Sequence, residues 1–362
     1  MRKLLIIICL LFSSIGVYAQ EAANSQPEEI YTTSYVSGTV IEKEINENGF
    51  VNYRTRLRDG RIIDVDTYGE VIEEGDSIYL EHLEDLGEYN FITVNRSTSV
   101  ILLLILFVGS IIVLAKKKGL RSLGSLIISM ALLFFGLVPL LLSGVDPVLV
   151  TILFGLGVLF VSIFVTHGFN YQSLVSFLGS FGSVLLAIVL IALVSEYSSL
   201  TGLINDEIQF LSFESEKVLN LTRIISASII IGVLGVLDDI TITQVAVVRE
   251  LSSDTTLTRS HIFTKALRVG RDHISSLVNT LVFAYVGATL PMIMFITLLD
   301  IPFYILISQE FIFIEIIRSL IGAIALTLAV PLTTWLATHV FLGHIHRDAC
   351  TLDSACAHHH HH

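Results

Sequence analysis

Seven long apolar runs follow one another along the chain after residue 98, with short polar segments between them. At ~1.5 Å per residue, each run forms a helix that crosses most or all of a ~30 Å hydrocarbon layer. Lipid offers no hydrogen bonds to an open backbone, so these runs predict a membrane protein built as an α-helical bundle of about seven transmembrane helices. The runs are Val100–Ala115, Leu123–Leu142, Pro147–Thr166, Leu174–Val194, Leu221–Val248, Ile274–Leu299 and Phe313–Phe341.

The composition supports this fold class and localises the charge. Hydrophobic residues make up 53% of the chain and charged residues only 15%, which is typical of a multipass membrane protein and excludes an ordinary soluble enzyme. The formal net charge is −12, and residues 21–97 alone hold seventeen Asp and Glu against six Lys and Arg, a difference of −11. The acidity therefore belongs to one soluble domain that precedes the bundle.

Four regions follow from these patterns. Residues 1–19 resemble a secretory signal peptide, since basic residues precede a short apolar run and small residues end at Ala19; an uncleaved anchor is the alternative. The other regions are an extracytoplasmic β-domain at 20–97, the transmembrane domain at 98–345, and a cytoplasmic tail at 346–362 that ends in a purification-tag-like run, His358–His362.

The acidic segment shows the alternation of short β-strands. Asp59-Gly60 is a hairpin signal and Glu74-Gly75-Asp76 a turn signal, so we expect a small, OB-like β-barrel. Oligonucleotide binding is not expected, because the segment lacks a basic and aromatic stripe. A solvated β-domain is the simplest interpretation, and attraction of cations or basic partners is the alternative. The expected strands are Tyr35–Ile41, Phe50–Arg54, Arg61–Val65, Ser77–Leu80 and Tyr89–Val94.

Basic residues in alternate loops predict the orientation. With the β-domain outside, Lys and Arg gather in the cytoplasmic loops and Asp and Glu in the external ones, which places the tail in the cytoplasm. Phe303–Ile312 is too short to cross the membrane alone and is expected to be an external interfacial or re-entrant piece. The last run is expected to be one helix kinked and broken at Pro331; two spans there would place the tail outside.

Two adjacent carboxylates, Asp238 and Asp239, lie near the centre of the apolar run Leu221–Val248. An ionised Asp at that depth costs at least ~2.5 kcal/mol on insertion scales, so both must face protein or water. Asp239 lies on a helical stripe of small and polar residues and is expected to be packed against another helix. Asp238, about 100° away, is expected nearer a cavity. The stripe is Ser228, Gly232, Gly235, Asp239 and Thr243.

Nearby polar side chains complete a candidate ion- or proton-binding site. Thr241, Thr243 and Gln244 follow the aspartates on the same helix, and Asn279 lies one and a half turns inside the next run. Carboxylate, hydroxyl and amide oxygens suit a proton, Na⁺ or a divalent cation. The supporting polar residues are Asp272, His273 and Thr280. Simpler roles are also open: the aspartates could lock helices together, Asp272 could favour a helix start, and His273 could be interfacial.

Three segments together resemble the YibE/F-like family of bacterial multipass membrane proteins. They are G-V-L-G-V-L-D-D-I-T-I-T-Q at 232–244, R-V-G-R-D-H-I-S-S-L-V-N-T-L-V-F-A-Y-V-G-A-T-L-P at 268–291, and A-V-P-L-T-T at 329–334. The likeness covers most of the chain from the β-domain onward. It implies a multipass protein of the bacterial plasma membrane with an extracytoplasmic β-domain, and a related membrane subunit as a conceivable partner. It implies no particular activity.

The residues favour transport over catalysis. Metalloprotease, nucleotide-binding and nucleophile-elbow motifs are absent, and both aspartates share one helix, unlike those of intramembrane aspartyl proteases. We expect a proton- or cation-coupled permease in the lipid bilayer, acting on a small ion or solute, with no cofactor beyond a bound Na⁺, H⁺ or divalent cation. The alternatives are a non-transporting envelope scaffold and a gated ion channel, and a homo-oligomer is an expected assembly.

Overall fold

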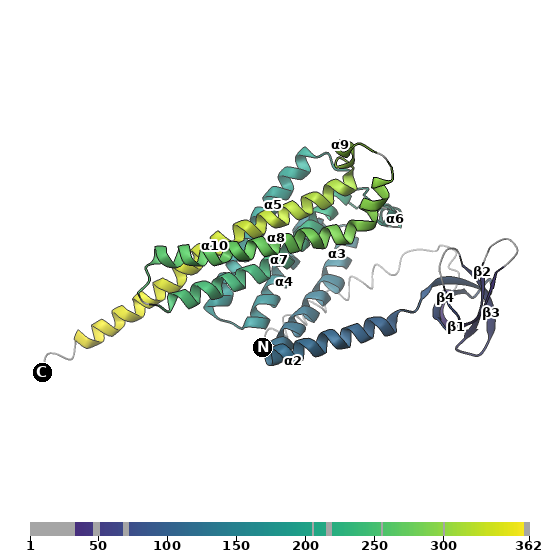
Figure 1. Cartoon of the computed structure of the whole chain (residues 1–362), viewed down its shortest axis with the longest axis horizontal. Coiled ribbons are helices and arrows are strands. Elements are labelled where there is room, and N and C mark those ends of the chain that lie inside the picture. The colour runs from purple at the N-terminus through teal and green to yellow at the C-terminus, as the bar shows by residue number, and fades with distance from the viewer. Residues whose placement is uncertain are drawn as a thin grey trace. The chain divides into compact units, whose positions relative to one another are not determined.

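The computed structural model describes residues 33–45, 51–67, 72–204, 206–214, 219–254, 256–299 and 301–357. It divides into two compact units (Figure 1): one contains the β-domain and the helix after it as far as Lys116, and the other begins at Lys117. The expected signal peptide at 1–19 and the run His358–His362 lie outside the described residues.

The β-domain is one five-stranded antiparallel sheet with the strand order β3-β2-β1-β4-β5. The edge strands β3 and β5 contact each other, so the sheet curls into a half-barrel. All five expected strands are confirmed. They are β1 (Thr33–Ile45), β2 (Val51–Leu57), β3 (Ile62–Thr67), β4 (Ser77–Leu83) and β5 (Glu88–Val94).

Both predicted turns are also confirmed. Gly60 and Gly75 have φ angles of 90° and 95°, a region that residues with a side chain rarely adopt. In the first turn the backbone N–H of Arg61 donates to the Asp59 carboxylate at 3.0 Å, and this hydrogen bond lowers the pKa of that carboxyl. The first turn sets the register of β2 with β3, and the second leads into β4, which pairs with β1.

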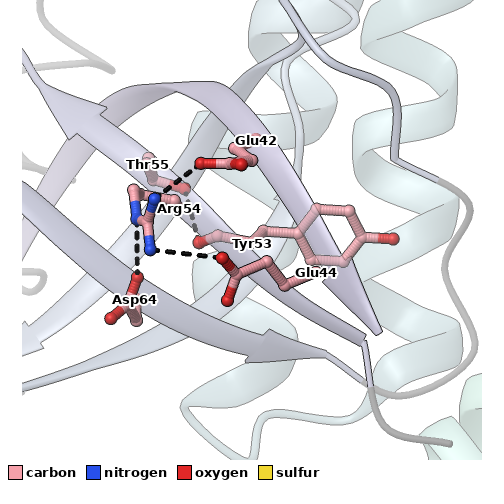
Figure 2. Close-up of polar contacts among 6 residues, drawn as sticks. All are labelled: Glu42, Glu44, Tyr53, Arg54, Thr55 and Asp64. Atoms are coloured by element: carbon pink, nitrogen blue, oxygen red, sulfur yellow. Dashed lines mark hydrogen bonds and ion pairs between the residues drawn. The ribbon is translucent and has the colours of Figure 1, made fainter. Parts of the chain in front are cut away.

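The two faces of the sheet differ in polarity. Tyr53 and Val65 are buried in an apolar core, whereas the neighbouring residue Arg54 points out. Figure 2 shows its guanidinium among three carboxylates: Glu42 at 2.6 Å, Glu44 at 3.3 Å and Asp64 at 3.7 Å. Arg54 therefore offsets part of the negative charge on the outer face of β1, β2 and β3.

A helical stretch of 46 residues, Ser97–Leu142, contains the first two expected spans. Its first helix, α2 (Ser97–Leu132), is interrupted at Lys116, whose φ of 49° and ψ of −128° are not helical. A π-helical turn, η1 (Leu133–Leu137), and α3 (Val138–Leu142) follow. Two expected spans lie within this one helical stretch. The described residues therefore contain six helices that are long and apolar enough to cross a membrane, where seven were expected.

The remaining expected spans are all helices, and several extend beyond their apolar runs. α8 and α10 are longer than predicted, since an apolar run marks only the part of a helix suited to hydrocarbon. α10 passes through Pro331, so a single last helix is confirmed but the expected break is absent. The helices are α4 (Pro147–His167), α5 (Tyr171–Tyr197), α6 (Asp206–Glu214), α7 (Leu221–Ser252), α8 (Arg259–Thr297), α9 (Phe303–Leu306) and α10 (Glu310–Ala357).

Helix α7 is the centre of the bundle. It packs against α4, α5, α8 and α10, and its apolar side chains, such as Leu237, form the main core with residues of α5 and α10. α8 and α10 run side by side along the bundle (Figure 1). Side chains on α7 therefore meet residues from four other helices.

Candidate functional site

Polar contacts near both ends of α7 fix its position in the bundle. At its start, Arg223 forms an ion pair with Asp146, which also caps α4 by accepting from the backbone N–H of Leu149 at 3.0 Å. Near its other end, Arg249 donates to the side-chain oxygen of Gln172 on α5 at 3.0 Å. Asp238 and Asp239 lie between these two anchors, near the middle of the helix.

Asp238 lies at the contact between α7 and α4. Its side chain is half-buried, and one carboxylate oxygen accepts a hydrogen bond from the hydroxyl of Ser162 on α4. The imidazole of His167, at the end of α4, interacts electrostatically with this carboxylate. One turn before Asp238, Leu234 packs against Gly155 of α4, where a Cβ would lie 2.4 Å from the leucine side chain, so this glycine lets the two helices approach. Ser162 was not predicted for the site, since a single serine in an apolar run carries no distinctive signal.

Asp239 is exposed on the surface of the described bundle, so the expectation that it is packed against another helix is wrong. The stripe that carries Asp239 is only partly covered by neighbouring helices. A Cβ on Gly232 would lie 2.8 Å from the hydroxyl of Tyr285 on α8, whereas Gly235 faces open space. The packed position belongs to Asp238, and Asp239 faces outward from the bundle.

Thr241 links the Asp238 turn to helix α5. It is fully buried, its hydroxyl lies 2.7 Å from that of Ser180, and it donates to the backbone carbonyl of Asp238 at 3.2 Å. Thr243 is half-buried on the stripe of Asp239. Of the two threonines predicted for the site, Thr241 is therefore the one that leads into the bundle.

Gln244 connects α7 to both α8 and α10. Its side chain is 2% exposed, and its amide donates to the carbonyl of Ala266 at 2.9 Å and to the hydroxyl of Thr334 at 2.7 Å. Gly270 leaves room for this amide, since a Cβ there would lie 2.9 Å from the side-chain oxygen of Gln244. Gln244 thus joins the neutral polar interior of the bundle, as a buried amide requires.

A seam of buried hydroxyls continues from Thr241 between α5 and α10. Thr333 is fully buried against Gly179, where a Cβ would lie 2.4 Å from the threonine hydroxyl, and among the described residues this hydroxyl has no hydrogen-bond partner. Thr334 donates back to the carbonyl of Val330 at 2.6 Å. The seam therefore contains an oxygen that is free to accept or donate.

The predicted residues on α8 do not join the aspartates. Asp272, Asn279 and Thr280 are exposed, and His273 is half-buried. Thr280 bonds within its own helix, to the carbonyl of Ser276 at 3.0 Å, and no hydrogen bond between described residues connects Asn279 to α7. The helix pairing predicted for α7 and α8 exists, but the side chain of Asn279 lies on the outer face of α8.

The structure brings together a second ionisable pair, which was not predicted from the sequence. Glu315 and Arg318, three residues apart on α10, form an ion pair at 2.6 Å. The same rule that drew attention to Asp238 would have found them, because both lie inside an apolar helix. Among the described residues, no group of three or more His, Cys, Asp and Glu side chains is arranged to hold a metal ion.

Comparison with known proteins gives one match. The YibE/F-like protein family matches residues 103–343, from within α2 to within α10. The β-domain lies outside this match, although the resemblance was expected to begin there. No curated protein and no solved structure matches the chain. The match covers well over half of the sequence and includes both aspartates, so the chain belongs to the YibE/F-like protein family.

Proposed function

We propose that this protein is a proton- or cation-coupled membrane permease and that Asp238 is the carboxylate that binds and releases the ion. The observation that carries the proposal is the position of Asp238: a half-buried carboxylate in the middle of the central helix, hydrogen-bonded to Ser162. An ionisable group inside a membrane helix makes insertion into the bilayer less favourable. Its presence there therefore indicates a functional role.

The seam of neutral oxygens beside Asp238 supports an ion route. The backbone of Asp238 is linked to the hydroxyl of Thr241, and that hydroxyl to Ser180, so polar groups lead from α7 into α5. His167 provides a titratable group at the end of α4. Carboxylate and hydroxyl oxygens are ligands for H⁺, Na⁺ or a divalent cation, so these three ions are the candidates.

The proposal includes a topology of seven spans. The 46 residues of Ser97–Leu142 would extend ~69 Å as one helix, more than twice the hydrocarbon thickness, and the interruption at Lys116 divides them into two spans. Lys116, Lys117 and Lys118 then lie in the cytoplasm, the β-domain and its signal peptide direct the N-terminus outside, and the tail is cytoplasmic. The bacterial plasma membrane is the compartment that fits this arrangement.

The β-domain is proposed to be OB-like, a partly open five-stranded barrel. Its strand order and the contact between β3 and β5 support this assignment. Its outer face remains acidic even with Arg54 among its carboxylates, so it suits a cation-rich surface outside the membrane. Nucleic acid is not a proposed partner, since its phosphates would be repelled.

Ion flux in proteoliposomes tests the function. Protein with Asp238→Asn and Asp239→Asn would be compared with wild type in three arms, which follow H⁺, Na⁺ and a divalent cation across the membrane. At least one flux should be present in wild type and lost in the double variant. Glu250→Gln, an exposed change near the end of the same helix, is the matched control and should transport normally. Flux that persists unchanged in the double variant would refute the proposal.

The exposure of Asp239 favours a second candidate function, an envelope scaffold that assembles with a second copy or a related membrane subunit. A carboxylate on the outer face of a membrane helix gains from a polar protein neighbour, and Asn279 on the outer face of α8 has the same need. Cysteine cross-linking at Gly235, whose outward side is open, would identify such a neighbour. Cross-linked protein without any ion flux would favour the scaffold.

A further inference from the structure

The ion pair of Glu315 and Arg318 lies inside the last candidate span, within Glu310–Leu342. Both side chains are mostly buried, with 29% and 21% of their surface exposed, respectively. A second nitrogen of Arg318 donates to the hydroxyl of Ser228 on α7 at 3.0 Å. The pair therefore sits where α10 meets α7, away from Asp238.

The two residues of the pair have different surroundings. Arg318 is held toward α7 by Ser228, and its guanidinium lies 6.0 Å from the centre of the Tyr285 ring. Glu315 instead lines a cavity of about 300 Å³ between α8 and α10, and Arg318 is not part of that lining. The lining therefore includes the acidic residue of the ion pair and not the basic one. A carboxylate has about four acceptor sites, so the bond to Arg318 leaves Glu315 able to accept from a ligand.

The remaining lining is that of a small-molecule site. Apolar side chains such as Val286 and Phe311 form most of the wall, with Ser319 beside Glu315. The hydroxyl of Thr289 donates to the carbonyl of Tyr285 in its own helix at 3.0 Å, and that of Tyr285 lies toward Gly232 on α7. Pockets for small ligands are of this size and combine an apolar wall with a few polar groups.

The cavity is reached from the outer surface of the bundle. Val286, Ile316 and Leu320 line it and are also 42%, 39% and 56% exposed. In a membrane helix pair these faces border hydrocarbon, so a ligand enters from the bilayer and must itself be lipophilic.

We propose that the cavity between α8 and α10 binds a small lipophilic organic ammonium ion, with its apolar body between the two helices and its N–H groups donating to the carboxylate of Glu315. The negative end of the ion pair selects the charge of the ligand, and the apolar lining selects its body. This site is separate from Asp238, so it stands or falls independently of the proposed permease activity.

Fluorescence binding with purified full-length protein in nanodiscs tests the site. The probe is a dansyl group on a five-carbon chain that ends in a primary ammonium, and its neutral twin ends in a hydroxyl. Saturable binding of the ammonium probe is expected to weaken by at least about tenfold in Glu315→Gln, the usual loss when a hydrogen bond to a charged group is removed. Binding of the neutral twin should not change, and Glu250→Gln, outside the cavity, should bind both probes like wild type.

Two further variants keep the test decisive. Glu315→Gln leaves the charge of Arg318 without its ion-pair partner. The double variant, Glu315→Gln with Arg318→Gln, removes both charges and should show the same selective loss of binding of the ammonium probe. Ser319→Trp fills the cavity and should abolish binding of both probes. If both probes bind equally well and Glu315→Gln changes the binding of neither, the cavity is a groove for acyl chains only and the proposal is overturned. Absence of saturable binding in folded wild-type protein would overturn it as well.

Discussion

The hydroxyl of Ser162 on α4 donates a hydrogen bond to the carboxylate of Asp238 on α7. This contact joins α7 to α4 in the middle of the bundle through a carboxyl group on one helix and the only serine of the other. It also explains which of the two adjacent aspartates is held in place: Asp238 has a partner on a neighbouring helix, and Asp239 faces outward.

Replacing Ser162 tests this contact. Ser162→Ala should lower the free energy of unfolding by ~1 kcal/mol, because hydrogen bonds between membrane helices contribute about 0.6–2 kcal/mol. Titration with SDS in mixed micelles measures it. Ser162→Thr, which keeps the hydroxyl, should restore stability, and Thr280→Ala, which removes a hydroxyl bonded within its own helix, should change little. Equal losses in Ser162→Ala and Thr280→Ala would contradict the contact.

The close approach of α5 and α10 depends on Gly179. A Cβ there would lie within 3.1 Å of three atoms of Thr333, a stiff β-branched side chain, so Gly179→Ala should destabilise the bundle by ~1–3 kcal/mol. Gly157→Ala is the matched control, because nothing lies within 4 Å of its Cβ position. Its better helix propensity should leave stability unchanged or raise it by up to ~1 kcal/mol. The apparent melting temperatures of the two variants measure the effect. Equal decreases in Gly179→Ala and Gly157→Ala would rule out this account of the packing.

Gln244 and Thr334 should be energetically coupled. In a double-mutant cycle of Gln244→Leu and Thr334→Val, the two changes should be non-additive by about 0.6–2 kcal/mol, because each removes the same bond at 2.7 Å. The free energy of unfolding of the four proteins gives the coupling. Strictly additive losses would show that the bond contributes nothing to the bundle.

In the β-domain, the ion pairs of Arg54 should matter less than its buried neighbour. Arg54 and its three carboxylates are 40–62% exposed, and exposed ion pairs contribute ~0–1 kcal/mol to stability. Arg54→Ala should therefore barely change the protection of the β2 amides from hydrogen exchange. Tyr53→Ala should reduce it strongly, since this ring is 1% exposed and large aromatic truncations cost ~3–5 kcal/mol. Similar effects of the two changes would refute this ranking.

Local signals in the sequence predicted the elements well. Strand alternation and the turn at Asp59-Gly60 gave all five strands, and hydropathy gave every long helix of the bundle, because both patterns depend on neighbours along the chain. Helix ends were less accurate: α8 begins at Arg259, well before its apolar run, since its first turns are polar and give no hydropathy signal.

The arrangement of the site could not be predicted in the same way. A helical wheel gives the angle between Asp238 and Asp239 but not which face a neighbouring helix covers. That depends on contacts such as Gly155 with Leu234, which join residues far apart in sequence. Ser162 was missed for the same reason, and Asn279 was assigned to the site by its depth although its side chain points outward. Glu315 and Arg318, in contrast, could have been predicted, because both are ionisable residues inside an apolar run.

Site-resolved labelling of Asp238 with a hydrophobic carbodiimide tests the central claim most directly. Carbodiimides modify protonated carboxyl groups in apolar surroundings, and mass spectrometry of the labelled protein identifies the residue. We predict that Asp238 is labelled and that labelling decreases as the pH rises and when the coupling cation is added. A carboxylate that exchanges an ion must respond in this way. Absence of label at Asp238 at every pH, or labelling that ignores both pH and cations, would contradict ion exchange at this residue.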